Sequence, residues 1–229
     1  MVFGKIEYLN LLPFHVFMKR FTKSSQQSAS MHYKRGVPAE VNKKFLSRRV
    51  DAAFISSISA QKYPHVELGI VAKKDVKSVL VIPSKNSKND VESASSNVLA
   101  RVLDVKGEVL IGDKALRYYL ENKPHVDLAG EWNRQYGSSF VFALLCYHKD
   151  KKVYKEIEKQ FLKRRVRIPR YILKQASLKT SVKEEDILEY LKYISYNLDA
   201  KAKLGLKKFY ALSKTLWVSL LTLFYNFLD

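Results

Sequence analysis

Short apolar runs alternate with polar turns and amphipathic segments along the first part of the chain. Apolar runs bounded by turn residues predict strands, and apolar positions three or four residues apart predict helices. The predicted strands lie around Ile6 and Tyr8 and over residues 31–37, 50–55 and 68–71. The predicted helices between them cover residues 13–21, residues 39–47 and a segment that ends near Tyr63. This β-α-β-α-β-α-β order favours a parallel sheet with helices on its faces.

The pattern changes after residue 82 and indicates a second lobe. Residues 76–82 form one more predicted strand, with Ser78 early in it, and residues 83–90 are polar and rich in Lys, Asn and Ser. Further predicted elements are a helix through residue 103, a buried strand over 108–113 that ends in Gly-Asp, a helix over 114–120 and an apolar strand over 140–147. The strand over residues 140–147 is expected to cross back from the second lobe to the first. The first lobe is therefore predicted to comprise residues 1–82 and 144–229, and the second lobe residues 83–143.

The last third of the chain is basic and predicted to be helical. Val153, Ile157 and Phe161 share one face of a helix, which Pro169 interrupts. Two further amphipathic helices are predicted over residues 186–198 and 206–227. The second has an apolar stripe made of Phe209, Leu212, Leu216, Leu220 and Leu223. We expect these C-terminal helices to pack on the first lobe.

The charge balance narrows the possible partners. Lys and Arg number 41 against 22 Asp and Glu, a formal net charge of +19, which favours nucleic acid, an anionic membrane surface or an acidic small molecule. A basic surface without such a partner is an equally good interpretation. The basic run over residues 163–167 lacks the interleaved aromatic residues of a nucleic-acid module, so a solvated helix face is preferred. The single cysteine, Cys146, lies in an apolar run and is expected to be a packed core residue.

The ends of the chain favour a cytoplasmic protein. Residues 1–4 lack the basic and apolar regions of a signal peptide. The apolar run over residues 216–228 is too short, and too interrupted by polar residues, for a membrane span. No nucleic-acid or membrane partner is therefore expected, and the oligomeric state stays open.

Polar side chains follow predicted strands, or begin predicted helices, in both lobes. They are Asn10, Ser56, Ser57, Ser78, Ser93, Ser95, Ser96 and Asp113. Ligands in open α/β sheets bind at the carboxyl ends of strands, and free N–H groups at a helix start bind carboxylates and phosphates. A simple capped helix explains the serines at 93–96 equally well. Most of these groups are neutral hydrogen-bonding groups, which suits an oxygen-rich anion held in a cleft between lobes.

Other kinds of site are disfavoured. The chain has no glycine-rich phosphate loop and no Cys/His cluster at metal-ligand spacing, and its five histidines are scattered. Neither a metal nor another cofactor is expected. No serine occupies a G-x-S-x-G elbow, although residue order alone does not exclude a catalytic triad.

The ordered motifs resemble those of chorismate dehydratases of the futalosine route to menaquinone. The opening motif is Gly4-Lys5-Ile6-x-Tyr8-Leu9-Asn10-x-x-Pro13. The next matches are Asp51-x-Ala53-x-Ile55-Ser56-Ser57, Val76-Lys77-Ser78-Val79 and Ser93-x-Ser95-Ser96. The later ones are Leu110-Ile111-Gly112-Asp113-x-Ala115-Leu116, Asp127-Leu128-x-x-x-Trp132, Phe140-Val141-Phe142-Ala143, Tyr196-x-Leu198 and Gly205-Leu206-x-x-Phe209. The chain departs from the family at Tyr136-Gly137-Ser138-Ser139, where Thr-Gly-Leu-Pro is usual.

The resemblance implies a two-lobed α/β fold like that of type II periplasmic binding proteins, with a ligand cleft between the lobes. It implies conversion of the dianion chorismate to 3-(1-carboxyvinyloxy)benzoate and water. It also implies catalytic hydrogen-bonding roles for Asn10 and Ser78, and substrate binding by Ser56, Ser57, Ser93, Ser95, Ser96 and Asp113. One alternative is 1,4-dihydroxy-6-naphthoate synthase of the same pathway, whose opening motif differs. Another is a non-catalytic binding protein for an anionic solute.

Overall fold

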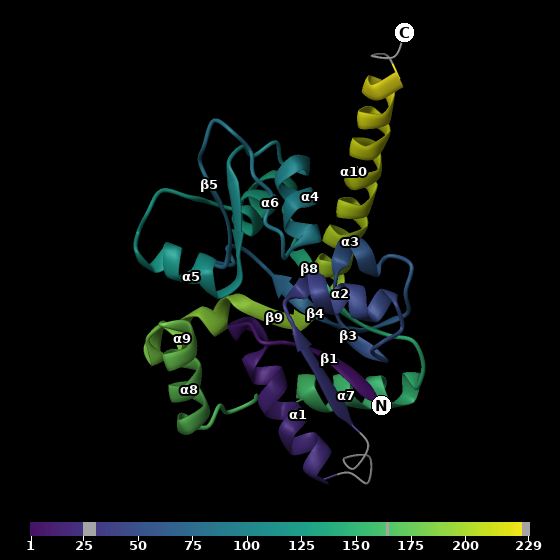
Figure 1. The fold of residues 1–229 in the computed structure, drawn as a ribbon, viewed down its shortest axis with the longest axis vertical. Coiled ribbons are helices and arrows are strands. Elements are labelled where there is room, and N and C mark those ends of the chain that lie inside the picture. The colour runs from purple at the N-terminus through teal and green to yellow at the C-terminus, as the bar shows by residue number, and fades with distance from the viewer. Residues whose placement is uncertain (25–30, 164, 226–229) are drawn as a thin grey trace.

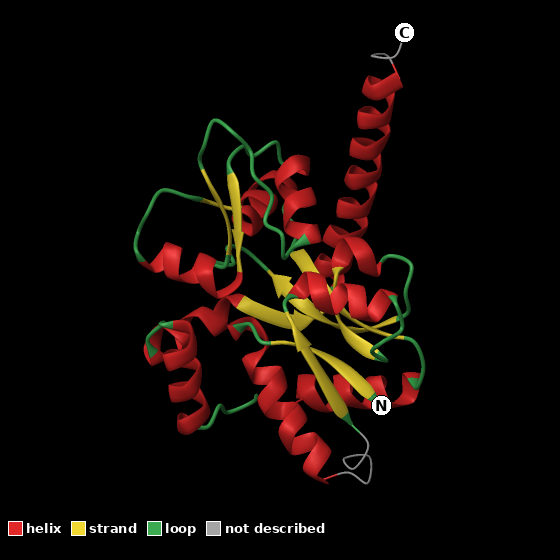
Figure 2. Cartoon of the chain, viewed as in Figure 1, coloured by secondary structure: helices red, strands yellow, loops and turns green. Residues whose placement is uncertain are grey.

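The computed structural model describes residues 1–24, 31–163 and 165–225. Two sheets organise them (Figure 1). The large sheet has the strand order β2-β1-β3-β8-β4-β9, and the small sheet has the order β6-β5-β7. Figure 2 shows helices on both sides of the large sheet. The two-lobed α/β arrangement predicted from the sequence is confirmed.

The large sheet is only partly parallel. Its strands are β1 (Val2–Ile6), β2 (His32–Gly36), β3 (Ala52–Ser56), β4 (His65–Ala72), β8 (Phe140–Tyr147) and β9 (Ile194–Asn197). β1 pairs in parallel with β2 and β3, as the β-α-β pattern predicts. However, β8 lies between β3 and β4 and is antiparallel to both. The first four strands therefore run in the same direction, as predicted, but β8 separates β4 from β3, so the sheet is mixed and not parallel throughout.

The small sheet contains β5 (Val79–Ile82), β6 (Glu108–Ile111) and β7 (Val126–Asp127), all antiparallel. The helices that follow or precede these strands are α4 (Ala94–Val102), α5 (Gly112–Leu120) and α6 (Leu128–Tyr136). Sheet membership differs from the predicted lobe limits, because β5 belongs to the small sheet and residues 140–143 belong to the large one. Ser78 precedes β5 instead of lying within a strand.

The remaining helices belong to the first and last parts of the chain. They are η1 (Leu9–Leu11), α1 (Leu12–Ser24), α2 (Pro38–Leu46), α3 (Ser57–Ala60), α7 (Lys151–Lys163), α8 (Arg170–Thr180), α9 (Glu184–Tyr190), η3 (Leu191–Tyr193) and α10 (Ala200–Tyr225). The predicted helix over residues 186–198 is wrong in its second half. There Ile194 and Ser195 pair with the edge of β4, and this pairing satisfies backbone groups that a helix would otherwise satisfy internally. Residues 165–169 are not helical, so Arg165 and Arg167 of the basic run do not lie on a helix face, whereas Lys163 ends α7.

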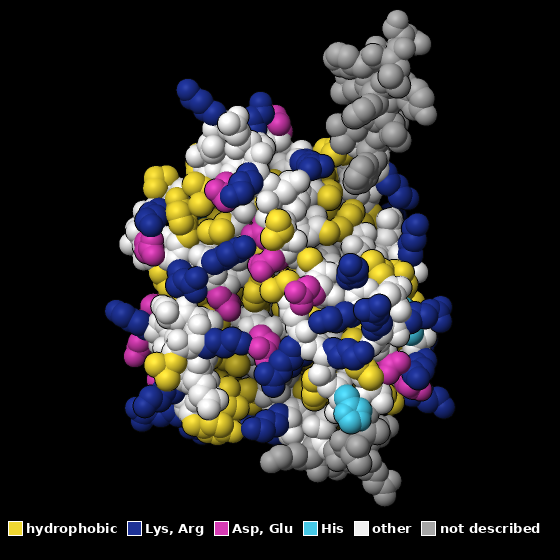
Figure 3. Space-filling view, viewed as in Figure 1, with side chains coloured by type: hydrophobic (Ala, Val, Ile, Leu, Met, Phe, Trp, Pro, Cys, Tyr) yellow, Lys and Arg dark blue, Asp and Glu magenta, His cyan; other side chains and the backbone are white. Residues whose placement is uncertain are grey.

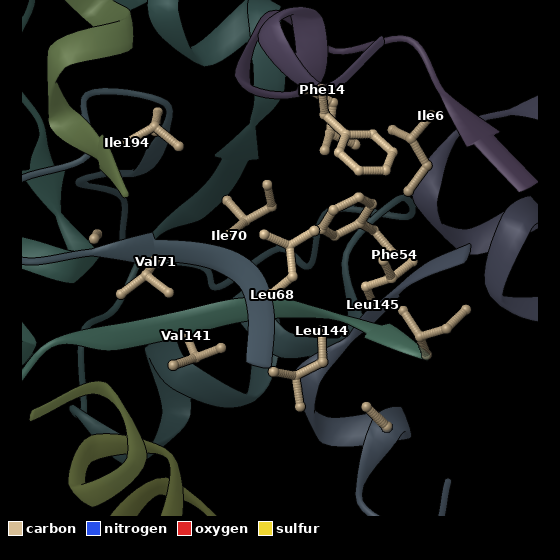
Figure 4. Close-up of a cluster of buried hydrophobic side chains, with 14 of the residues drawn as sticks. Ile6, Phe14, Phe54, Leu68, Ile70, Val71, Val141, Leu144, Leu145 and Ile194 are labelled. Carbon is tan, nitrogen blue, oxygen red and sulfur yellow. The ribbon is translucent and has the colours of Figure 1, made fainter. Parts of the chain in front are cut away.

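Aromatic rings join the helices to the large sheet. Phe14 of α1 packs edge-to-face on Phe54 of β3, with ring centroids 4.9 Å apart, and on Phe161 of α7 at 5.3 Å. Figure 4 shows Phe14 and Phe54 among apolar side chains of β4 and β8. Cys146 is buried in β8, as predicted, and burial raises the pKa of its thiol to about 12. The thiol is therefore a core group and not a nucleophile.

The C-terminal helices differ in where they pack. α7 contacts β4 and α1, as predicted for the first lobe, whereas α10 contacts both β8 and α4. Phe209 of α10 packs on Trp132 of α6 and Phe140 of β8. The C-terminal helices were predicted to pack on the first lobe. For α10 this prediction is incomplete, because α10 also packs on α4 of the second lobe. The side chains of Leu220 and Leu223 lie outside the described ones. None of the helices within the described residues combines the length and hydrophobicity needed to cross a membrane.

Candidate functional site

A cavity of about 70 Å³ lies between the two sheets and is lined from both. We call it the polar cavity. Five of the predicted site residues line it: Asn10, Ser56, Ser78, Ser93 and Ser96. Apolar residues such as Ile6, Phe54 and Phe142 form much of the remaining wall. None of its described lining residues carries a formal charge, so the cavity offers hydrogen bonds and helix ends to a ligand.

Asn10 lies in the short helix η1 directly after β1. Its backbone carbonyl accepts a hydrogen bond of 2.6 Å from the hydroxyl of Tyr196 on β9, which fixes the turn. Its side-chain Oδ1 is buried and has no hydrogen-bond partner among the described residues. Leaving a buried amide oxygen unpaired costs about 1–3 kcal/mol. The side chain is therefore available to a ligand that donates a hydrogen bond.

Ser78 is held by a residue that the sequence analysis did not identify. The hydroxyl of Tyr190 donates a hydrogen bond of 2.8 Å to Ser78 Oγ, and both residues are buried. Burial raises the pKa of Tyr190, so this phenol keeps its proton and remains the donor. Ser78 then has its own hydroxyl proton free to donate into the cavity.

The serines at the start of α4 have two different roles. Ser93 is the N-cap, and its Oγ accepts a hydrogen bond from the backbone N–H of Ser96 at 3.2 Å. Ser93 and Ser96 line the cavity, so the N-terminus of α4 lies at its wall. By contrast, Ser95 Oγ lies 3.0 Å from Ser57 Oγ and accepts from the N–H of Ile58. Ser57 and Ser95 thus join α3 to α4 and do not line the cavity.

Ser56 is positioned by Asn42, a buried residue of α2. The Asn42 amide donates to Ser56 Oγ at 2.8 Å, and its Oδ1 accepts from the Ser56 N–H at 3.2 Å. The sequence analysis missed Asn42. The available signal was a polar residue beside Val41 on the inner face of the predicted helix, near Phe45.

Asp113 lies behind the cavity wall, not in it. Its Oδ1 accepts a hydrogen bond of 3.0 Å from the backbone N–H of Leu9, which joins α5 to the segment before Asn10. Burial raises the pKa of this carboxyl from 3.8 to about 6, against a lowering effect of the Leu9 hydrogen bond. A second contact between the lobes is nearby, where the Tyr8 hydroxyl donates to Glu92 at 2.5 Å. Asp113 therefore acts on the cavity through Leu9.

The carboxylates and histidines of the described residues do not form a metal site. No group of three or more His, Cys, Asp or Glu side chains lies close enough together in the described ranges to hold an ion. The arrangement supplies neutral donors and acceptors around a small, mostly apolar space. It is suited to orienting a ligand and stabilising developing charge by hydrogen bonds.

Comparisons with known proteins show the family of the chain. A family model described as menaquinone biosynthesis matches residues 1–106 and 85–215. A curated chorismate dehydratase from Campylobacter jejuni is 42% identical over 94% of this chain and 99% of its own length.

Solved structures with low sequence identity share the fold. A protein from Archaeoglobus fulgidus superposes with a TM-score of 0.72 at 15% identity, covering 95% of this chain and 97% of its own. The alkanesulfonate-binding protein of Xanthomonas axonopodis, solved with MOPS, gives a TM-score of 0.55 at 10% identity over 95% and 92% of the two chains. A Candida albicans protein with the generic periplasmic binding protein fold gives 0.51 at 11% identity over 94% and 90%. The fold is thus periplasmic-binding-protein-like, and the chain belongs to the menaquinone biosynthesis family.

Proposed function

We propose that this chain is a chorismate dehydratase, which converts chorismate to 3-(1-carboxyvinyloxy)benzoate and water in the futalosine route to menaquinone. The observation that carries the proposal is the polar cavity with the unpaired Asn10 amide, in a chain 42% identical to a protein of that name. Under this proposal the enzyme is a hydro-lyase that works in the cytoplasm without a cofactor.

The proposed reaction needs orientation more than a strong base. Chorismate loses the C3 proton and the C4 hydroxyl as one molecule of water, and the ring becomes aromatic. We assign the leaving hydroxyl to Asn10 and Ser78, whose amide and hydroxyl supply an acceptor and donors in a largely apolar space. A hydroxyl that donates to Asn10 Oδ1 would satisfy its unpaired oxygen.

A carboxylate of the substrate is assigned to the N-terminus of α4. Ser93 already donates its hydroxyl to Ser96 Oγ at 2.8 Å, so the first-turn N–H groups and the Ser96 hydroxyl are the donors there. The helix dipole also favours an anion. Since no described lining residue of the cavity is a carboxylate or an imidazole, we assign the acceptor of the C3 proton to the substrate's own carboxylate.

Entry of the substrate requires the lobes to separate. The cavity of about 70 Å³ is smaller than the roughly 300–1,000 Å³ of typical ligand sites. We propose that opening breaks the Tyr8–Glu92 and Leu9–Asp113 hydrogen bonds, which join the two lobes beside the cavity. The described structure then corresponds to a closed arrangement.

The proposal is tested by incubating the purified chain with chorismate and following both compounds by liquid chromatography. The Asn10→Ala and Ser78→Ala variants should lower kcat by about 10²–10³, the usual effect of removing one aligned hydrogen-bonding group. Asn86→Ala and Ser177→Ala are matched controls, because both residues lie away from the cavity, and they should keep normal rates.

The same assay separates the alternatives. A solute-binding protein would bind chorismate and leave it unchanged, and the naphthoate synthase would not consume it. Intact chorismate in the presence of a chain with a normal thermal melting transition would therefore refute the proposal. Wild-type rates in both cavity variants would refute the roles assigned to Asn10 and Ser78.

A further inference from the structure

A second and larger cavity, of about 540 Å³, lies between α1 and α8. We call it the α1–α8 groove. Its apolar surface is formed by the partly buried Leu12, Ile172 and Ala176, beneath which lie the buried Leu9, Val16 and Met18. Figure 3 shows hydrophobic surface between these two helices with Lys and Arg side chains beside it. The volume is within the range of small-molecule sites, and the proposed dehydration does not use it.

Cationic side chains dominate the charge of the groove. Lys5, Lys19, Arg35 and Lys179 line it, and Glu7 is the only carboxylate among its described lining residues. Glu7 lies 3.3 Å from Lys5, 3.4 Å from Arg35 and 2.7 Å from Lys179. The hydrogen bond from Lys179, together with the charge of Lys5, lowers the pKa of Glu7 to about 2. The groove therefore carries a positive potential that one internal carboxylate does not balance.

Lys19 is the cation best placed for a ligand. No described Asp or Glu lies within ion-pair distance of it, and its ammonium is 5.9 Å from the ring centroid of Tyr171. Tyr171 and Tyr33 line the groove and are 57% and 39% exposed. Exposed tyrosines offer flat faces and a polar tip, so they suit stacking against a planar ligand. Cations and aromatic faces thus occur together over an apolar floor.

We propose that the α1–α8 groove is a second binding site, for an organic anion with a flat apolar body such as an aromatic carboxylate. The carboxylate meets Lys19 and Arg35 at the exposed edge of the groove. The apolar body lies on Leu12, Ile172 and Ala176, beside the exposed tyrosines that line the groove. Tyr8 borders both this groove and the polar cavity, so the two sites share one wall.

The test is a calorimetric titration of the full chain with 1-naphthoate, compared with neutral 1-naphthalenemethanol. Naphthoate is expected to bind, and the alcohol to bind more weakly. The double variant Lys19→Met/Arg35→Met should weaken naphthoate binding about two- to thirtyfold, since each of the two exposed ion pairs contributes about 0.2–1 kcal/mol. Lys201→Met/Lys207→Met removes two exposed cations of α10 and should leave the affinity unchanged. Saturating chorismate should not displace naphthoate.

Four results would overturn the proposal. They are no binding of naphthoate up to about 10 mM, equal affinity of the acid and the alcohol, equal affinity of the two double variants, and displacement by chorismate. Melting curves of both variants show whether a lost affinity reflects a lost fold, and Ala176→Trp provides a second test by filling the groove without changing its charge. Because binding is measured without turnover, failure here is distinct from failure of the dehydratase assay.

Discussion

Single side chains determine how the two lobes meet beside the polar cavity. Asp113 of α5 holds the backbone N–H of Leu9, and Tyr8 reaches Glu92 in the other lobe. Neither carboxylate lines the cavity, yet both act on the segment that carries Asn10. Of these two carboxylates, Asp113 gives the clearer pH test, because burial raises its pKa to about 6.

Asp113→Asn is expected to stabilise the protein at neutral pH. A raised pKa means that the folded chain holds this proton more tightly than the unfolded chain, so the contribution of Asp113 to stability falls as pH rises from about 4 to about 6. The Asn side chain still accepts from Leu9 and carries no charge. We expect a gain of about 1–3 kcal/mol at pH 7 that vanishes near pH 4.

Urea unfolding of the wild type and the variant at pH 4, 5 and 7 measures this difference. Other titrating groups affect both proteins alike, so the difference isolates position 113. A difference that does not change with pH would contradict the prediction.

At the scale of elements, the N-termini of two helices of the second lobe form part of the cavity wall. The start of α4 contributes Ser93 and Ser96, and the start of α5 contributes Gly112. Gly112 has φ +68°, and a Cβ there would lie 2.7 Å from the ring of Tyr8. A glycine is thus required both by the backbone turn from β6 into α5 and by the close approach of Tyr8.

Gly112→Ala should destabilise the chain by about 2–4 kcal/mol, because it adds a contact with Tyr8 to the strain of a left-handed alanine. It should also raise KM for chorismate under the proposed function, since Tyr8 lines the cavity. Gly137→Ala is the matched control. Gly137 has φ +63° at the C-cap of α6, and no atom lies within 4 Å of a Cβ built there.

Thermal or urea unfolding of both variants separates the cost of backbone strain from the cost of the contact with Tyr8. The control should lose only about 1 kcal/mol from backbone strain. Equal losses in the two variants would show that the Tyr8 contact is unimportant.

On the scale of the whole molecule, the positive charge of the chain lies outside the polar cavity. The chain carries a formal net charge of +19, while the described lining residues of the polar cavity carry none. The positive charge of the surface therefore attracts a dianionic substrate before it binds. Once the substrate is bound, neutral groups in the cavity form hydrogen bonds to it.

This separation predicts that kcat/KM for chorismate falls several-fold as ionic strength rises from about 10 to about 300 mM, because the screening length shortens from roughly 30 Å to below 8 Å. The value of kcat should change little, since none of the described residues that line the cavity is a cation. Steady-state kinetics over a potassium chloride series measures both constants. A salt-independent kcat/KM would contradict steering by the net charge.

Local patterns alone predicted much of the fold. The elements up to β4, the buried strand over residues 140–147 and the capped helix start among the serines at 93–96 all depend on neighbouring residues, through apolar spacing and turn chemistry. Asn10, at the end of the first strand, is a local feature of the same kind. These were predictable because the signal lies within a few residues of each position.

Long-range pairing decided the rest. β8 entered between β3 and β4, and β9 replaced a predicted helix, because each strand found its partner far away in the chain. The same is true of the site: Tyr190 holds Ser78 across 112 positions, and Asp113 holds Leu9 across 104. The sequence by itself determined the local elements and the polar residues that end strands or begin helices, but not Tyr190 and Asn42, which hold them. Only the tertiary structure decided which of them face the cavity, since hydrogen-bond partners and burial depend on contacts that no local pattern encodes.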